Sequence, residues 1–138
     1  MKFKYQKRTQ SLNPAHPWTL KPLIEMTLSY QRRRVRLWAL LDSGADVSIF
    51  DTSLATLLGI ELETGLPQQF AGITGRTTGY FHHVTLDVIG MHHPLPVAVA
   101  FAEMQGIKAV LGQADFFQHH TITFARATEQ IEIQPVKL

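Results

Sequence analysis

The sequence predicts an all-β fold, mainly β-strands with two short helices. Short runs of alternating apolar and polar residues recur along the chain, and glycines and prolines separate them at intervals typical of hairpins. The length of 138 residues fits one folded domain, and an apolar content of 45% suffices for a single core. We therefore expect one compact β domain.

The first 20 residues differ in character from the rest of the chain. They are polar and basic, contain Pro14 and Pro17, and follow no clean hydrophobic period. We expect residues 1–20 to form a loosely ordered N-terminal arm and residues 21–138 to form the domain.

Two predicted strands lead to one acidic residue. Residues 21–30 alternate between apolar and polar side chains, as in a half-buried strand, and the arginine-rich residues 31–34 form the predicted hairpin tip. Residues 35–41 become apolar on both faces, which is typical of a strand that enters the interior. This second strand ends at Asp42.

The next segment predicts a turn, a short strand and a helix. A Ser43-Gly44 turn precedes the predicted strand 47–50, after which Asp51 or Thr52 caps a helix of one to two turns. Gly59 provides its C-terminal stop, and the following strand is expected to begin near Ile60.

The second half of the chain predicts hairpins. Glycines that interrupt strand-forming residues predict a long hairpin with a flexible tip at residues 66–80. The remaining predicted elements are strands at 81–89, 95–101 and 109–112, a helical turn at 113–118, and two closing strands at 121–124 and 130–133.

Composition excludes several classes of protein. A formal charge of +2 and a pI near 9.1 do not amount to a nucleic-acid-binding signature. The absence of cysteine excludes disulfides and thiolate metal sites. No apolar segment has the length of a signal-peptide core or of a membrane span. We expect a soluble cytoplasmic protein that binds neither membrane nor nucleic acid.

Asp42 is the residue that most needs an explanation. A carboxylate between two apolar strands is costly unless it is hydrogen-bonded or functional. Taken alone, Asp-Ser-Gly is compatible with a structural turn in which the aspartate accepts backbone N–H groups. Two further motifs in the chain favour a functional carboxylate over a structural turn.

Three motifs follow one another along the chain: Leu40-Leu41-Asp42-Ser43-Gly44-Ala45-Asp46, Gly72-Ile73-Thr74-Gly75 and Ala109-Val110-Leu111-Gly112. With these motifs the chain resembles the retropepsin family, the single-domain aspartic proteases of retroviruses and their cellular and bacterial relatives. The resemblance covers roughly residues 21–134 and includes a departure at Gln113, where relatives often have an arginine directly after the glycine.

The resemblance implies a closed retropepsin-like acid protease barrel that forms a homodimer and hydrolyses peptide or protein substrates. It also implies a flap at residues 70–80 and candidates for an intersubunit sheet at residues 131–133 and in the strand before Trp18. The implied site residues are Asp42 as the catalytic residue, Ser43 and Gly44 as support for its loop, and Ala45, Asp46, Ala71, Gly72 and Ile73 as contacts for substrate.

The chemistry of peptide hydrolysis explains why a homodimer is expected. Two carboxylates that share one proton can act as base and acid together, because neighbouring like charges resist simultaneous ionisation. The chain contains only one Asp-Ser-Gly motif. The second carboxylate must then come from Asp42 of another copy, and no cofactor or metal is expected.

Three alternatives remain open from the residues. The first is a catalytically silent retropepsin-like module for dimerisation or peptide binding, and the second is a small basic β domain that binds nucleic acid. The third concerns the His-His pairs at 82/83, 92/93 and 119/120, which suggest metal binding. Surface or turn positions suit these histidines better, because adjacent residues on a strand point to opposite faces.

Overall fold

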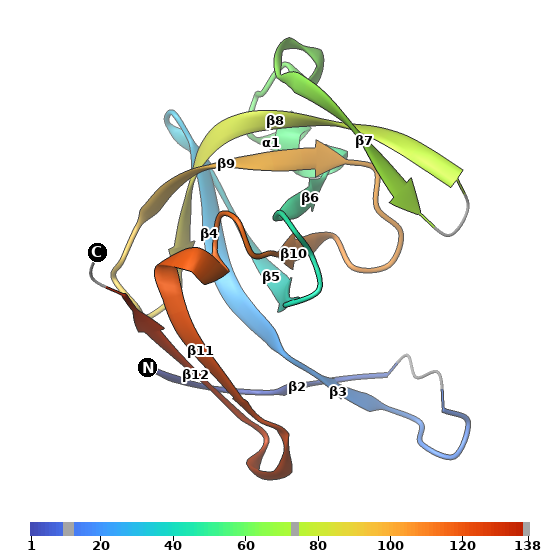
Figure 1. Ribbon diagram of the computed structural model, residues 1–138, viewed down its shortest axis with the longest axis vertical. Helices are drawn as coiled ribbons and strands as arrows, with labels where there is room; N and C mark the ends of the chain where they lie inside the picture. The colour runs from blue at the N-terminus through green and yellow to red at the C-terminus, as the bar shows by residue number, and fades with distance from the viewer. Residues whose placement is uncertain (10–12, 73–74, 137–138) are drawn as a thin grey trace.

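The structure is a computed structural model that describes residues 1–9, 13–72 and 75–136 (Figure 1). It is built mainly of strands, with one short α-helix and three single turns of 3-10 helix among the described residues. The strands are β1 (Lys2–Lys4), β2 (Gln6–Arg8), β3 (Thr19–Lys21), β4 (Leu23–Tyr30), β5 (Arg33–Leu41), β6 (Ile49–Asp51), β7 (Leu66–Gly72), β8 (Gly75–Val88), β9 (Leu95–Ala102), β10 (Ala109–Leu111), β11 (His120–Ala125) and β12 (Gln130–Pro135).

Six strands close into a barrel. The largest sheet has the order β4-β5-β10-β6-β9-β8-β7, and a further pairing between β4 and β8 joins its two sides. The pairs β5–β10 and β6–β9 are parallel, whereas the other pairs are antiparallel. The predicted all-β fold with a closed barrel is therefore confirmed.

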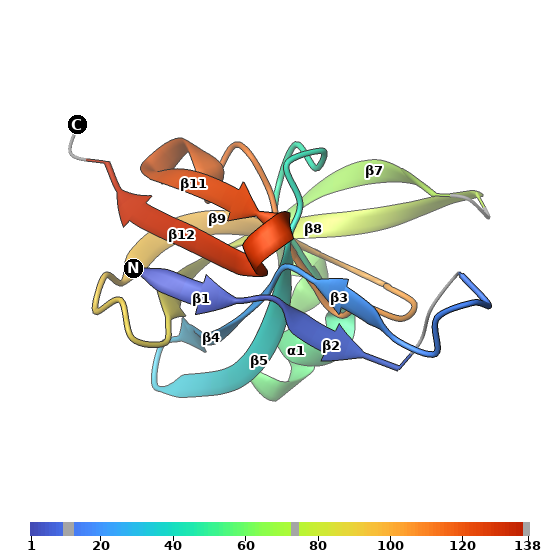
Figure 2. The same ribbon diagram turned by 90° about the horizontal axis from the view of Figure 1, so that it is seen from below.

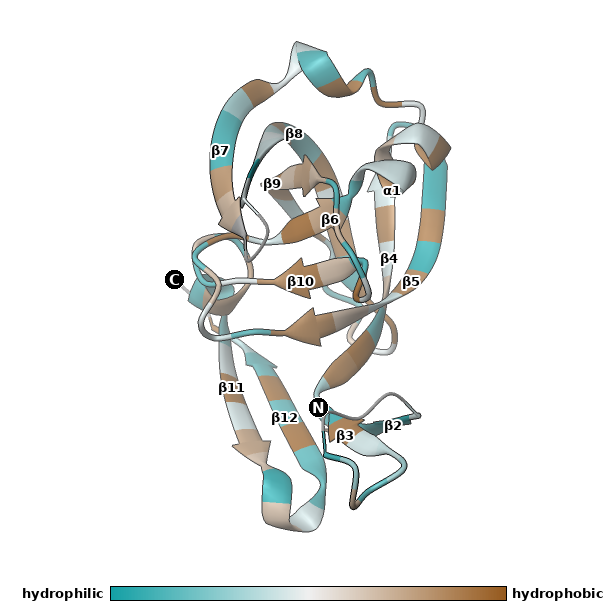
Figure 3. Ribbon diagram, turned by 90° about the vertical axis from the view of Figure 1, so that its right-hand side faces the viewer, coloured by the Kyte–Doolittle hydropathy of each residue, from teal (hydrophilic) through white to brown (hydrophobic). Residues whose placement is uncertain are grey.

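The barrel encloses the hydrophobic core. Figure 3 shows hydrophobic residues on β10, β6 and the end of β5, where the strands lie in the interior. Phe50 and Phe101 are completely buried, with ring centroids 6.0 Å apart. The apolar strand that ends at Asp42 therefore enters the interior, as its sequence predicts.

The helix α1 (Thr52–Leu57) follows β6 and confirms the predicted cap. The side chain of Asp51 accepts a hydrogen bond from Ser53 N, and Gly59 adopts a left-handed φ of 72° beyond the helix. Leu54 and Ala55 are buried against the barrel. Among the described residues, no helix is long and apolar enough to cross a membrane.

A second, three-stranded sheet has the order β1-β12-β11, and β2 pairs with β3 in a separate hairpin. Figure 1 shows both below the barrel, and Figure 2 shows them from that side. The N-terminal segment, which the sequence analysis expects to be loosely ordered, thus contributes β1 and β2 to sheets. The partner strand of β1 lies about 130 positions away, and no local pattern in the sequence indicates such a pairing.

Two elements of the structure differ from those predicted from the sequence. The prediction of a strand that begins near Ile60 is wrong: residues Leu62–Thr64 form a 3-10 turn, η1, and the strand begins at Leu66. Thr64 explains the turn, because its hydroxyl and its N–H both donate to the carbonyl oxygen of Glu61. The expected helical turn at 113–118 ends in a second 3-10 turn, η2 (Phe117–His119).

The long hairpin predicted at residues 66–80 is confirmed as β7 and β8, with Gly72 opposite Gly75. β8 is longer than expected and continues without a break through residues 81–88 to pair with β9. The residues predicted for the hairpin tip, Ile73 and Thr74, lie outside the described residues.

Candidate active site

Asp42 lies at the point where β5 leaves the barrel. Its N–H donates to the carbonyl oxygen of Leu111 at 3.0 Å, and the preceding Leu41 N–H donates to Pro22 at 2.9 Å. These two bonds hold the end of β5 between the segment that contains Pro22 and strand β10. The side chain of Asp42 is half-buried.

The turn after Asp42 directs a backbone donor at its carboxylate. Gly44 N–H donates to Oδ1 of Asp42 at 2.9 Å, and Ala45 N–H donates to the Asp42 carbonyl oxygen at 3.1 Å. A Cβ at Gly44 would lie 3.2 Å from the same Oδ1. Glycine therefore allows the close approach of this N–H, and the Ser43 side chain remains exposed.

A second segment holds the Asp42 loop (residues 42–48) from β10. The N–H groups of Gln113 and Ala114 donate to the carbonyl oxygens of Ala45 and Asp46, each at 2.9 Å. The Gln113 side chain also donates through Nε2 to the Ser43 carbonyl oxygen at 2.7 Å. Gln113, which departs from the arginine common in relatives, thus binds the loop directly.

Ser48 and Asp115 form a buried contact that no local pattern in the sequence indicates. The carboxylate of Asp115 accepts the N–H of Ser48 at 2.7 Å and also the Ser48 hydroxyl. The Ser48 oxygen in turn accepts the N–H of Gly112 at 3.0 Å. Burial raises the pKa of the Asp115 carboxyl, although the bonds from Ser48 act in the opposite direction.

The predicted substrate contacts lie on two segments. Ala45 and Asp46 belong to the Asp42 loop, where the Asp46 side chain is exposed. Ala71 and Gly72 end β7 in the long hairpin, and Ala71 is also exposed. Ile73 lies outside the described residues. Figure 1 shows the hairpin projecting from the barrel on the side where the Asp42 loop emerges.

The other aspartates have different surroundings. Asp51 caps α1 and also accepts Met104 N–H at 2.8 Å, whereas Asp87 lies in β8 opposite Thr27. Together with exposed Asp46 and buried Asp115, they complete the set of aspartates in the chain. Asp42 is the aspartate that directly follows a barrel strand and accepts the Gly44 N–H.

Two of the paired histidines lie within hydrogen-bond distance of backbone carbonyl oxygens. His82 Nε2 lies 2.7 Å from the Leu62 carbonyl oxygen, and His120 Nδ1 lies 2.7 Å from that of Phe116. Burial lowers the pKa of His120, whose ring stacks on Phe116 with centroids 4.3 Å apart. In the described part of the chain, no three His, Asp or Glu side chains are grouped as a metal site would require.

Comparisons with known proteins agree with this geometry. The model of the aspartyl protease family matches residues 30–114, which is more than half of the chain and includes the Asp42 loop and its contacts from β10. A comparison with curated proteins found no match.

Two solved structures have a similar fold. A retropepsin-like aspartic protease from Rickettsia conorii matches with a TM-score of 0.60 and 10% identity, over 81% of this chain and 89% of that chain. The EIAV protease, in complex with the inhibitor HBY-793, matches with a TM-score of 0.51 and 21% identity, over 67% of this chain and 81% of that chain. With the family match and the closed barrel, they show that the chain belongs to the aspartyl protease family and has the retropepsin-like fold.

Proposed function

We propose that the protein is an aspartic endopeptidase that acts as a homodimer. The observation that carries this proposal is the half-buried Asp42 carboxylate, which accepts Gly44 N–H at the end of a barrel strand. The bonds from Gln113 and Ala114 support a fixed position for its loop. Such fixed geometry is what acid–base catalysis requires of the reacting groups.

In the proposed reaction, the Asp42 carboxyls of two copies share one proton. The ionised carboxylate takes a proton from a water molecule, whose oxygen attacks the peptide carbonyl carbon while the other carboxyl protonates the carbonyl oxygen. The tetrahedral intermediate then collapses as its nitrogen is protonated and the C–N bond breaks. The rate should follow a bell-shaped or acid-shifted pH profile that belongs to the pair of carboxyls.

The remaining predicted residues complete the proposed site. Ser43 is proposed to bond across the two-fold axis between the Asp42 loops, and the hairpin at residues 70–80 is proposed to close over substrate as a flap. Substrate would bind as an extended strand beneath this hairpin. The proposed contacts are Ala45, Asp46, Ala71, Gly72 and Ile73.

The test is cleavage of a mixed peptide library by the wild-type protein and by Asp42→Asn, at several pH values. Asparagine retains an oxygen that can accept Gly44 N–H, so the variant should fold but lose cleavage. Absence of cleavage by a folded wild-type dimer at every pH would instead favour a catalytically silent binding module. Equal cleavage by both proteins would exclude Asp42 as the catalytic residue.

A further inference from the structure

We infer that the outer face of β5, together with the adjoining strands β1 and β2, forms a binding site for single-stranded nucleic acid. The inference goes beyond the proposed peptidase activity, because this face lies along β5, whereas Asp42 follows the end of that strand. It also revises the expectation that the chain binds no nucleic acid. That expectation depends on the small net charge and not on where the charges lie.

The basic residues are concentrated in the N-terminal part of the chain. Nine of the 13 lysines and arginines precede residue 37, whereas Glu25 is the only acidic residue before Asp42. The other ten acidic residues and the other four basic residues lie in residues 42–138. The net charge of +2 is therefore a small difference between a strongly basic segment and an acidic remainder. Such asymmetry is typical of proteins that bind polyanions.

The pairing of β4 with β5 places part of this charge on one outer face of the barrel. Successive residues of a strand point to opposite faces, and Ala39 and Leu41 are buried in the core. Arg34, Arg36 and Trp38 therefore point outward, and all three are exposed. Successive side chains on this face lie about 7 Å apart along the strand, so they can follow an extended polyanion.

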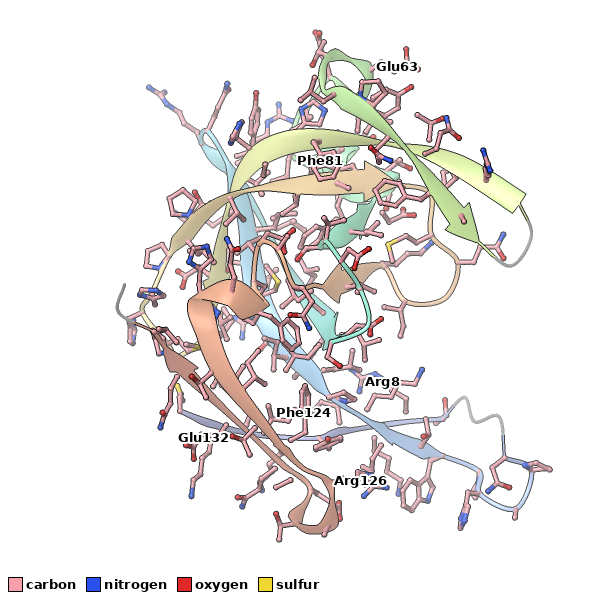
Figure 4. The ribbon with its side chains drawn as sticks, in the orientation of Figure 1. Arg8, Glu63, Phe81, Phe124, Arg126 and Glu132 are labelled. Atoms are coloured by element: carbon pink, nitrogen blue, oxygen red, sulfur yellow. The ribbon has the colours of Figure 1, made fainter. Side chains whose placement is uncertain are left out.

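The N-terminal strands extend this face on the side of Trp38. The guanidinium carbon of Arg8 lies 5.5 Å from the centre of the Trp38 ring, which is the geometry of a cation–π contact. Figure 4 shows Arg8 on the hairpin of β2 and β3, below the barrel. Lys4 lies beside the same ring. We call these four cations, Lys4, Arg8, Arg34 and Arg36, together with Trp38 the basic face.

Acidic side chains neutralise only part of the basic face. Glu25 accepts hydrogen bonds from Nε and Nη2 of Arg36, each at 2.8 Å. Asp87 lies on β8, on the far side of β4 from β5. In the described part of the chain, the other three cations of the basic face form no ion pair. They are therefore available to phosphate groups.

A hollow of about 170 Å³ lies beside the Trp38 ring, between the N-terminal strands and the barrel. Phe3, Trp38 and Ile89 contribute apolar walls, and Lys4 and Gln6 contribute polar groups. A nucleobase has a flat face that stacks on aromatic rings and a polar edge that forms hydrogen bonds. The walls of the hollow match both properties.

The position of Trp38 favours nucleic acid over an anionic membrane. Peripheral proteins bind membranes by burying apolar side chains below the lipid headgroups, and such side chains must protrude. Trp38 is 40% exposed, but its ring forms a wall of the hollow and lies under the Arg8 guanidinium. A flat base can reach such a recessed ring. In the inferred complex, one base enters the hollow while Arg8 and Arg34 bind phosphates of the same strand.

The first test measures the charge contacts through the fluorescence anisotropy of a labelled single-stranded oligothymidylate at several salt concentrations. Arg8→Gln combined with Arg34→Gln removes two charges of the basic face. Arg76→Gln combined with Arg126→Gln is the matched control, because both are exposed arginines outside that face. The first pair should reduce the slope of log affinity against log salt by about 1.4, since each phosphate contact contributes about 0.7. The control pair should leave the slope unchanged.

The second test measures stacking on Trp38. The chain has two tryptophans, so Trp18→Phe leaves Trp38 as the only one. A base that enters the hollow should quench the fluorescence of this tryptophan. Trp38→Leu, which keeps an apolar wall, should weaken binding about fivefold or more, the effect of losing one stacked base. Circular dichroism of each variant checks that it is folded.

Several results would overturn the inference. They are the absence of oligonucleotide binding at low salt, binding without quenching of Trp38, and equal effects of the two arginine pairs. Equally tight binding of polyaspartate, a polyanion without bases, would also overturn it. Binding to phosphatidylserine vesicles through Arg8 and Arg34, without oligonucleotide binding, would assign the basic face to a membrane instead. These measurements do not involve peptide cleavage, so their failure is distinguishable from failure of the proposed peptidase.

Discussion

The side chain of Asp115 helps to hold the Asp42 loop in position through its bonds to Ser48. Its carboxylate holds both the N–H and the hydroxyl of Ser48, and Ser48 in turn accepts a bond from Gly112. Ser48 is completely buried and Asp115 is 6% exposed, so water cannot replace these bonds. The pair therefore joins the end of the loop to the segment after β10.

Asp115→Ala is expected to lower the free energy of unfolding by about 2–4 kcal/mol, because two buried donors of Ser48 lose their acceptor. Asp115→Asn should cost less, since its side-chain oxygen can still accept the Ser48 N–H. Urea unfolding of the three proteins measures both effects. Similar small losses for the two variants would contradict the role given to this contact.

The pH dependence of stability should contain a contribution from Asp51. Burial opposes ionisation of this carboxyl, but hydrogen bonds from Ser53 and Met104, together with the charge of Lys108, hold its pKa below the ordinary value of 3.8. A carboxyl whose pKa is lowered on folding stabilises the protein above its unfolded pKa. This stabilisation is lost as the pH falls through the lowered value.

Asparagine can still cap the helix, so Asp51→Asn removes mainly the negative charge and should cost about 0.3–1 kcal/mol at neutral pH, the typical value of a negative charge at a helix N-terminus. The difference in unfolding free energy between wild type and variant should shrink as the pH falls below 3.8. Denaturant unfolding at neutral and acidic pH measures it. A difference that stays constant or grows on acidification would exclude a lowered pKa for Asp51.

At the scale of elements, the contact between β10 and the Asp42 loop depends on close backbone packing. A Cβ at Gly112 would lie 2.5 Å from both the carbonyl carbon and the oxygen of Val47, and 2.8 Å from the Ala45 oxygen. These are backbone atoms of the loop, so they cannot move aside without displacing it. Glycine at this position lets the loop cross the end of β10.

Gly112→Ala should consequently lower the free energy of unfolding by about 1–3 kcal/mol and reduce any peptidase activity further than stability alone explains. Gly79→Ala is the matched control, because its nearest contact is the ring of Phe70, a side chain that can rotate. Thermal unfolding is measured for both variants, and peptide cleavage for Gly112→Ala alone, because Gly79 lies in the proposed flap. Equal effects of the two substitutions would contradict a special role for the backbone contact at Gly112.

Elements with local signals could be predicted from the sequence. The strand before Asp42, the cap at Asp51 and the hairpin at 66–80 each depend on residues close together in the chain. The pairing of β1 with β12 and the bond between Ser48 and Asp115 join residues 67 or more positions apart. Hydrophobic period and turn residues contain no information about such contacts. Asp115 could only be assigned to a presumed helix for this reason.

At the scale of the whole molecule, the site depends on two copies of Asp42. Mixing equal amounts of wild-type and Asp42→Asn chains, and allowing exchange, should leave about one quarter of the activity of wild-type protein at the same total chain concentration, because about one quarter of the dimers then have two intact carboxyls. Peptide cleavage across a series of mixing ratios should follow the square of the wild-type fraction. A linear dependence would mean that each chain works alone.

The bond between Met1 and Ile133 has a kinetic consequence. The bond joins residues 132 positions apart, so it brings the first strand of the chain against the last. In the unfolded chain, closing a loop of this length costs on the order of 4 kcal/mol of chain entropy. β1 is therefore disfavoured from pairing with β12 before the intervening domain has folded, and it then adds only three residue pairs. We therefore expect β1 to dock late in folding and to open early, so that its amide protons exchange with solvent well before those of β12.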